Sequence, residues 1–193
     1  ATLYEEVADI ESSTAILIKY RDVLQNKALD LATALTNKVL ERIINVDRNY
    51  KKGIKVLQPF VDFLIRQKKY KTAYEYAKKL LAYFIELKGF GKATVLFTQY
   101  KDQILEAGSE YIDWAEKFID LIFDMNLNAH RETIAAIVAK EFSEQLLSAK
   151  QYTRAIKYAK LAAHHFFNSG KQKEALTLLQ QLYDSFDLRI QFK

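Results

Sequence analysis

Histidine is the first side chain to examine for metal binding or proton transfer, and the chain has three: His130, His164 and His165. Neighbouring residues of a helix point about 100° apart, so His164 and His165 do not readily face one ion. No His-Glu-x-x-His spacing occurs, and no cysteine is present to complete a metal site or form a disulfide. We therefore expect no metal, and we interpret the pair as ordinary helical residues, one at a groove and one outward.

Two further arrangements could support catalysis. Acidic pairs such as Glu5-Glu6, or Asp113 with Glu116, could serve acid–base chemistry, but the sequence places no nucleophile or oxyanion donor beside them. Gly89-Phe90-Gly91-Lys92 lacks the full Gly-x4-Gly-Lys-Ser/Thr frame of a phosphate loop, and no strand precedes it. We predict no catalytic residue and no cofactor, and hence no enzyme. An enzyme with an unrecognised site remains an alternative.

A basic segment over residues 66–79 carries cations interleaved with aromatic rings. Its members are Arg66, Lys68, Lys69, Lys71, Lys78 and Lys79, with Tyr70, Tyr74 and Tyr76 between them. Aromatic rings among cations suit base stacking and phosphate contact in RNA. Charge runs on helices are more commonly solvated faces above buried rings, and we favour that reading. The five lysines stay candidates for partner contact.

The composition favours helices throughout. Of 193 residues, 50% are hydrophobic, only five are glycine and one is proline. Such scarcity of turn formers argues against a chain of β-turns. The net charge of +5 is mildly basic. No apolar run approaches the roughly 20 residues of a membrane span. No secretory signal opens the chain, so we expect a cytoplasmic protein. The chain does not begin with methionine, and we expect it to be part of a longer protein.

A repeat orders the chain from residue 70 onward. Aligned segments begin at Tyr70, Phe90, Tyr111, Glu132, Tyr152 and Gln172, in steps of 20, 21, 21, 20 and 20. Offsets of three, seven and ten lie on one helix face, and all eighteen such positions are apolar. The third position holds alanine in every segment except one, where it holds Trp114, which we expect to be largely buried; Trp114→Ala should then cost roughly 3–5 kcal/mol.

Turn-forming residues separate these segments. They are Gly89 and Gly91, Gly108-Ser109, Asn126-Leu127-Asn128, Ser148 to Gln151, and Asn168-Ser169-Gly170. Glycine and asparagine accept the left-handed conformation that ends a helix, and Ser109 could cap the next one. Short connections place neighbouring helices antiparallel. We therefore predict an all-α fold, a right-handed solenoid of helix hairpins with a period of about 41 residues.

The repeat weakens toward the N-terminus. Tyr50 begins a similar segment with Gly53, Leu57 and Phe60. Residues 14–46 hold no glycine or proline and predict one long helix, or two helices broken near Asn26-Lys27. We expect residues 1–48 to form an atypical N-terminal unit or cap, and residues 49–193 the repeat array, within a single domain overall.

The segments resemble the second helix of tetratricopeptide repeats, in which Tyr-x-x-Ala precedes Ala-Leu. The resemblance covers residues 70–186 and is carried by Tyr70-Lys71-Thr72-Ala73-Tyr74, by Tyr152 to Ala159 and by Gly170 to Leu176. The Trp-Leu-Gly signature of the first helix and the closing proline are absent, and the usual period is 34 residues. The resemblance implies an array that binds peptides or protein segments, and it carries over no ligand residue.

The predicted function is a protein–protein interaction scaffold that binds a peptide or helix of a partner, within a larger assembly. An RNA-binding helical array using the basic segment is the alternative. The last helix should leave Leu178, Leu182, Tyr183 and Phe186 as an apolar patch for another chain.

Charge alternates along the array. Residues 49–110 are net +6, residues 111–150 net −3 and residues 151–193 net +4. We expect cross-helix ion pairs in which Asp113, Glu116 or Asp120 faces Lys78 and Lys79 on one side, and Arg154, Lys157 or Lys160 on the other. An acidic band there would interrupt the basic track that a nucleic acid needs.

Overall fold

A computed structural model describes residues 10–25, 28–45 and 47–190; for residues 10, 11, 13 and 185–190 it describes the backbone alone. These residues form nine α-helices and one 3-10 turn, with no strand among them, so the all-α prediction is confirmed. Contacts divide the chain into two compact units, Ala1–Gly89 and Phe90–Lys193, called unit 1 and unit 2 below.

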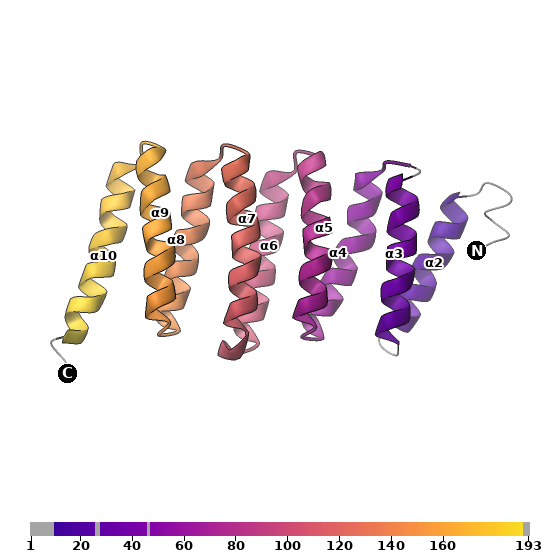
Figure 1. Ribbon diagram of the computed structural model, residues 1–193, viewed down its shortest axis with the longest axis horizontal. Coiled ribbons are helices and arrows are strands. Elements are labelled where there is room, and N and C mark those ends of the chain that lie inside the picture. Colours follow the sequence, from indigo (N-terminus) through magenta and orange to yellow (C-terminus); the bar gives the residue numbers. More distant parts are fainter. Residues whose placement is uncertain (1–9, 26–27, 46, 191–193) are drawn as a thin grey trace. The chain divides into compact units, whose positions relative to one another are not determined.

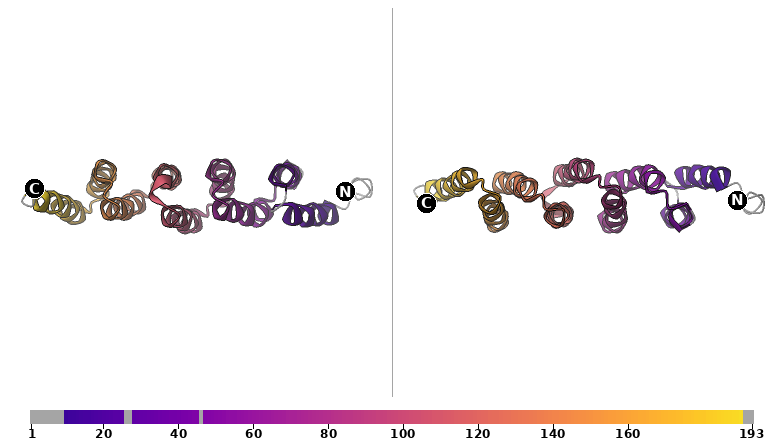
Figure 2. Two further views of the ribbon diagram at one scale, coloured as in Figure 1. Left: turned by 90° about the horizontal axis from the view of Figure 1, so that it is seen from below. Right: turned by 90° about the horizontal axis from the view of Figure 1, so that it is seen from above.

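Unit 1 contains four helices. They are α2 (Ile10–Leu24), α3 (Leu29–Asn45), α4 (Tyr50–Arg66) and α5 (Tyr70–Glu86). Each packs against the next one along the chain. Within this unit α2 and α4 lie in one layer, and α3 and α5 lie in the other (Figures 1 and 2). Arg21 of α2 donates a hydrogen bond of 2.6 Å to the Val56 carbonyl of α4, and Tyr76 of α5 donates one of 2.9 Å to Asn37 of α3.

Unit 2 contains five helices and the 3-10 turn. They are α6 (Phe90–Glu106), the turn η1 (Ser109–Tyr111), α7 (Ile112–Asn128), α8 (Glu132–Ser148), α9 (Tyr152–Asn168) and α10 (Gln172–Ile190). Successive helices again pack together. Within unit 2, α6, α8 and α10 share one layer and α7 and α9 the other (Figure 2). This layering brings helices about 40 residues apart in sequence side by side, and it positions the site described below.

The predicted helix starts at residues 50, 70, 90, 132, 152 and 172 agree with the structure. The exception is α7, which begins at Ile112 and not at Tyr111. The 3-10 turn from Ser109 to Tyr111 takes up residues that the alignment assigned to the helix. Ser109 therefore does not cap α7: its N-cap residue, Tyr111, makes no side-chain cap hydrogen bond.

The later start of α7 corrects the position of Trp114. Counted from Ile112, the small residue three positions into the helix is Ala115, which is fully buried. Trp114 is half-buried beside it, with the Lys117 ammonium 4.1 Å from its ring. The expected cost of Trp114→Ala therefore falls below the roughly 3–5 kcal/mol of a fully buried aromatic residue.

The apolar positions predicted from the repeat, at offsets of three, seven and ten in each segment, contribute to the core of each unit. Fourteen of these eighteen positions are buried, and the exceptions are Trp114, Leu121, Leu179 and Leu182. The first two reflect the shifted register of α7. The other two lie on α10, where Ala175 and Leu178 are the buried residues and Leu179 is exposed. Alanine at the third position lets neighbouring helix backbones approach closely.

Most helices end in the same way, at a three-residue turn whose middle residue is left-handed. In these turns Lys68, Lys88, His130, Lys150 and Gly170 have positive φ. The following residue donates its N–H to the carbonyl five positions back, as Lys69 does to Leu64 at 2.9 Å, which defines a Schellman motif. Only Gly170 fits the expectation of glycine or asparagine here. Asn128, Ser148 and Asn168 are the last residues of their helices, so those predicted breaks fall at helix ends, whereas Asn126 and Gly91 lie inside helices.

Replacing Lys150 with glycine is expected to raise the free energy of unfolding by about 0.5–1 kcal/mol, because a left-handed lysine is strained and glycine is not. The matched change Gly170→Ala should lower it by about 1 kcal/mol, since an added Cβ there meets nothing within 4 Å and only the backbone is strained. Urea denaturation measures both. Lys150→Gly at or below wild-type stability would contradict the assignment of strain to this turn.

The N-terminal part agrees with the two-helix alternative, since α2 ends at Leu24 and α3 begins at Leu29. The predicted break at Asn26-Lys27 falls on residues outside the described ranges. The predicted segment from Tyr50 is α4, with Gly53, Leu57 and Phe60 buried. Asn49 caps it, its side chain accepting the Lys52 N–H at 3.0 Å. The predicted boundary at residue 48 stays a prediction.

Among the helices of the described ranges, none combines the length and apolar character that crossing a bilayer requires.

Candidate binding cleft in unit 2

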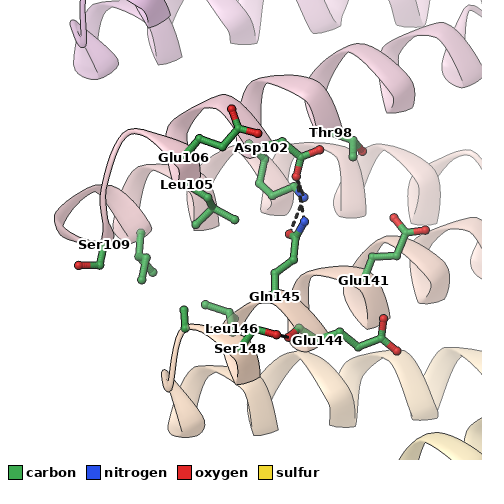
Figure 3. Close-up of a pocket in the computed structure, with 13 residues that line it drawn as sticks. Thr98, Asp102, Leu105, Glu106, Ser109, Glu141, Glu144, Gln145, Leu146 and Ser148 are labelled. Carbon is green, nitrogen blue, oxygen red and sulfur yellow. Dashed lines mark hydrogen bonds and ion pairs between the residues drawn. The ribbon is translucent and has the colours of Figure 1, made fainter.

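The most prominent cavity of unit 2 is an open cleft between α6 and α8, with a volume of about 780 Å³. Its wall on α6 consists of Thr98, Lys101, Asp102, Leu105 and Glu106, whose spacing of three and four residues places them on one helix face. Its wall on α8 follows the same spacing with Glu141, Glu144, Gln145 and Ser148. Leu146, Ala149, Ser109 and Ile112 complete the lining. We call this site the acidic cleft (Figure 3).

A buried lysine joins the two walls of the acidic cleft. The Lys101 side chain is only 2% exposed, and its ammonium forms an ion pair with Asp102. It also donates to the Gln145 side-chain oxygen at 2.5 Å, while the Gln145 amide nitrogen donates to Asp102 at 2.9 Å. These bonds close a triangle between α6 and α8, drawn as dashed lines in Figure 3. The buried Lys101 ammonium has a carboxylate and an amide oxygen as partners, and such pairing is the condition for burying an ammonium without a large penalty.

The charges around the cleft do not balance. Its lining has four carboxylates, on Asp102, Glu106, Glu141 and Glu144, against the single ammonium of Lys101. Glu144 also pairs with Lys140 at 3.6 Å. Glu106 and Glu141 are exposed, and neither forms an ion pair with any residue that the structure describes. The cleft therefore presents negative potential to solvent above a partly apolar lining.

Some polar groups of the acidic cleft are engaged within the protein. The Ser148 hydroxyl donates to the Glu144 carbonyl of its own helix at 3.0 Å, and Lys101 is fully engaged by its two partners. No histidine lines the cleft. What remains is a concave surface with apolar side chains, hydroxyls and uncompensated carboxylates, which are the usual components of a recognition groove.

The basic segment lies in unit 1, and the structure divides it into two groups. Arg66, Lys68, Lys69 and Lys71 are exposed around the turn between α4 and α5. Lys78 and Lys79 lie farther along α5. Lys78 pairs with Glu75 at 2.7 Å, and Lys79 donates to Asn37 at 3.2 Å.

The tyrosines of the basic segment mostly belong to the core. Tyr70 and Tyr76 are 3% and 4% exposed, so their rings are not available for stacking on bases. Tyr74 is half-buried, with the Lys78 ammonium 5.2 Å from its ring. The solvated-face interpretation thus agrees with the burial of two of the three rings.

The predicted C-terminal patch is not brought together as expected. Leu178 is buried and Leu182 half-buried, whereas Tyr183 is 64% exposed. The Phe186 side chain lies outside the described part. Leu176 and Leu179 are exposed instead. Leu178 faces the core and is therefore not part of an exposed patch, whereas Tyr183 is exposed as predicted and partner contact at this helix stays a prediction.

The histidines form no metal site. Among described residues, no group of three or more His, Asp or Glu side chains could hold an ion. His165 is partly buried, with its ring 5.4 Å from that of Phe123 and Nδ1 4.0 Å from Glu132, while His164 is exposed. Burial lowers the pKa of His165, and the neighbouring His164 lowers it further. The outward position predicted for one of the two histidines agrees with the exposure of His164, and the predicted place of the other at a groove stays a prediction.

Ion pairs do link α7 and α9 as predicted. Arg154 contacts Asp113 at 2.5 Å and Glu116 at 3.3 Å, and Lys157 contacts Glu116 at 2.7 Å. Asp120, the third acid of the expected set, accepts a hydrogen bond from the Tyr158 hydroxyl at 2.6 Å. The other half of the ladder, from Lys78 and Lys79 of unit 1, stays a prediction.

Burial raises the pKa of Asp120, and the hydrogen bond from Tyr158 offsets this only in part. A raised pKa means that the folded state favours the protonated carboxyl more than the unfolded chain does. This difference adds to the free energy of unfolding at pH values below the ordinary pKa of 3.8. The contribution is lost as the pH rises through the raised pKa. Asp120→Asn is therefore expected to be more resistant to urea than wild type at pH 7. The advantage should shrink as pH falls toward 4. A difference that is constant with pH would contradict the assignment.

Comparisons with known proteins place this geometry in no established family. No family model and no curated protein matches the chain. A solved structure with similarity is the crystal structure of BtubC (BKLC) from P. vanneervenii, 11% identical, with a TM-score of 0.45 over 96% of this chain and 84% of that one. A likeness this distant bears on neither fold nor function.

The acidic cleft was not predicted from the sequence. Its carboxylates come from helices whose contact residues lie about 40 positions apart, as in the 44-residue separation of Lys101 and Gln145. One signal was present in the sequence. The cleft-lining residues from Thr98 to Glu106 recur at spacings of three and four, and one of them is a lysine at a position that faces the core.

Proposed function

We propose that this chain is a protein-interaction module and that the acidic cleft holds a segment of its partner. The observation that carries the proposal is the cleft itself: an open cavity in unit 2 with apolar and charged walls and a fixed polar bridge at its base. Such sites position extended or helical segments by side-chain pockets and polar contacts. The partner, in this proposal, is a protein and not a metabolite that the chain converts.

The proposal includes the architecture predicted from the sequence, a tetratricopeptide-like right-handed solenoid with a period of about 41 residues. Supporting it, the ion pair of Lys157 with Glu116 joins residues 41 apart in unit 2, and the bond of Tyr76 to Asn37 joins residues 39 apart in unit 1. Arrays of this kind expose long surfaces to partners. A cytoplasmic location, membership of a larger assembly and the absence of enzymatic activity stay predictions.

RNA binding through the basic segment is the weaker candidate. Of its three aromatic rings, two are buried, and Lys78 and Lys79 each have an intramolecular contact. The group around Lys68 and Lys69 is exposed, and it serves as the control position in the experiment below.

Selection from a random peptide display library on the full chain tests the proposal. We expect selected peptides to lose binding when the cleft is filled by Thr98→Trp or by Ser148→Trp, two positions on opposite walls. The matched control Lys68→Glu/Lys69→Glu changes unit 1 and should leave binding intact. Circular dichroism melts confirm that each variant folds. Peptides whose binding ignores both tryptophan variants would overturn the proposal.

A further inference from the structure

We infer that the segment held by the acidic cleft is cationic and amphipathic: a stretch of protein in which lysine or arginine alternates with apolar side chains. The inference rests on the proposed function and goes beyond it by assigning the chemistry of the partner.

The first argument is charge. Lys101 is satisfied by Asp102 and Gln145, so the cleft has no cation left to offer an anionic ligand. Glu106 on α6 and Glu141 on α8, which form no ion pair with any described residue, leave negative charge on both walls (Figure 3). Phosphate or carboxylate groups would be repelled here. Ammonium or guanidinium groups would find acceptors on two sides, and arginine could bind a carboxylate through two parallel hydrogen bonds.

The second argument is the lining between the carboxylates. Leu105 is half-buried, and Ile112 and Leu146, which also line the cleft, are buried. An apolar side chain of the guest can cover Leu105, while the aliphatic stems of its lysine or arginine residues lie along the same surface. A cationic chain without apolar side chains would leave the apolar surface at Leu105 exposed to water. A guest in which cationic and apolar residues alternate can pair with the carboxylates and also cover the apolar part of the lining.

The third argument is the rigidity of the base. The triangle of Lys101, Asp102 and Gln145 ties α6 to α8 in hydrogen bonds of 2.5 and 2.9 Å, beside an ion pair. The two walls are therefore held at a fixed separation before any guest arrives. A preformed site binds with less loss of conformational freedom than one that must assemble.

A labelled peptide with alternating leucine and arginine tests the inference against the same peptide with glutamate in place of arginine. Fluorescence anisotropy with the full chain measures both affinities. We expect the arginine peptide to bind and the glutamate peptide not to bind. The double variant Glu106→Gln/Glu141→Gln should weaken binding of the arginine peptide about 5–10-fold, the size expected for two partly exposed ion pairs. Rising salt should weaken it as well.

The matched control is Asp124→Asn/Glu174→Gln, which changes the net charge equally at exposed acids of unit 2 outside the cleft. It should leave the affinity within about twofold of wild type, because exposed charges outside the cleft are screened. Equal binding of both peptides, or an equal effect of both double variants, would overturn the inference. If library peptides of other composition bind and are blocked by Thr98→Trp, the cationic assignment is wrong while the proposed function survives. If no peptide responds to Thr98→Trp or Ser148→Trp, the proposed function fails as well.

Discussion

Replacing Tyr158 with alanine is expected to lower the free energy of unfolding by about 3–5 kcal/mol, the usual cost of deleting a large buried aromatic side chain. Tyr158 is fully buried, and its ring meets that of Phe142 edge-on at a centroid distance of 4.8 Å. Its hydroxyl donates to Asp120 at 2.6 Å and lies 3.2 Å from Glu116. The residue thus joins α9 to both α8 and α7.

The conservative change Tyr158→Phe separates the ring from the hydroxyl. It should cost about 1–3 kcal/mol, because it removes a hydrogen bond to a charged acceptor and keeps the packing. Trp114 is the only tryptophan of the chain and lies in unit 2, so its fluorescence during urea denaturation follows the unfolding of that unit. A phenylalanine variant as unstable as the alanine variant would contradict the division between packing and hydrogen bonding.

Removing the bridge under the acidic cleft has the second largest expected effect. Lys101→Ala should lower the free energy of unfolding by about 2–4 kcal/mol, because it deletes a buried aliphatic stem and the cation that pairs with Asp102. The loss stays below that of a fully buried pair, since the Asp102 side chain is 40% exposed and can be hydrated.

Lys101→Met is the matched variant, since methionine keeps an unbranched apolar stem and lacks the charge. It should cost about 1–2 kcal/mol, less than the alanine change by the value of the retained packing. Equal losses for alanine and methionine would show that the charge alone matters. A methionine variant more stable than wild type would contradict the claim that the triangle stabilises unit 2.

The helix starts could be predicted because small and large apolar residues recur at offsets that only a helix face explains. The register of α7 could not be predicted in the same way. Both Trp114 and Ala115 can occupy a core position by type, and only the 3-10 turn from Ser109 decides that Ala115 does. A short turn of this kind leaves no periodic signal in the sequence.

Helix ends were predicted from residue types that accept positive φ, and helices do end at or near those places, but lysine or histidine often occupies the left-handed position in place of glycine or asparagine. The tight three-residue turns impose the left-handed conformation on Lys88, His130 and Lys150. Asn126 illustrates the opposite error. It was predicted as a helix break, yet it is fully buried in α7, where its amide donates to the Thr94 hydroxyl at 3.0 Å. A tertiary hydrogen bond there outweighs the local preference for a turn.

Charge patterning predicted the α7–α9 ion pairs because stacking helices one hairpin apart follows from the repeat. The same stacking brings α6 beside α8, and it would have predicted that Asp102 and Glu106 lie near Glu141 and Glu144. The burial of Lys101 could not be anticipated, since a lysine inside a helix is normally an exposed residue.

Hydrogen exchange of the full chain, with and without the arginine–leucine peptide, tests the central claim most directly. We predict that bound peptide slows exchange in α6 and α8 along residues 98–106 and 141–149, where the cleft walls lie. Residues 66–71, around the basic turn of unit 1, should exchange at an unchanged rate. Protection confined to residues 66–71, with none along α6 and α8, would contradict the assignment of the binding site to the acidic cleft.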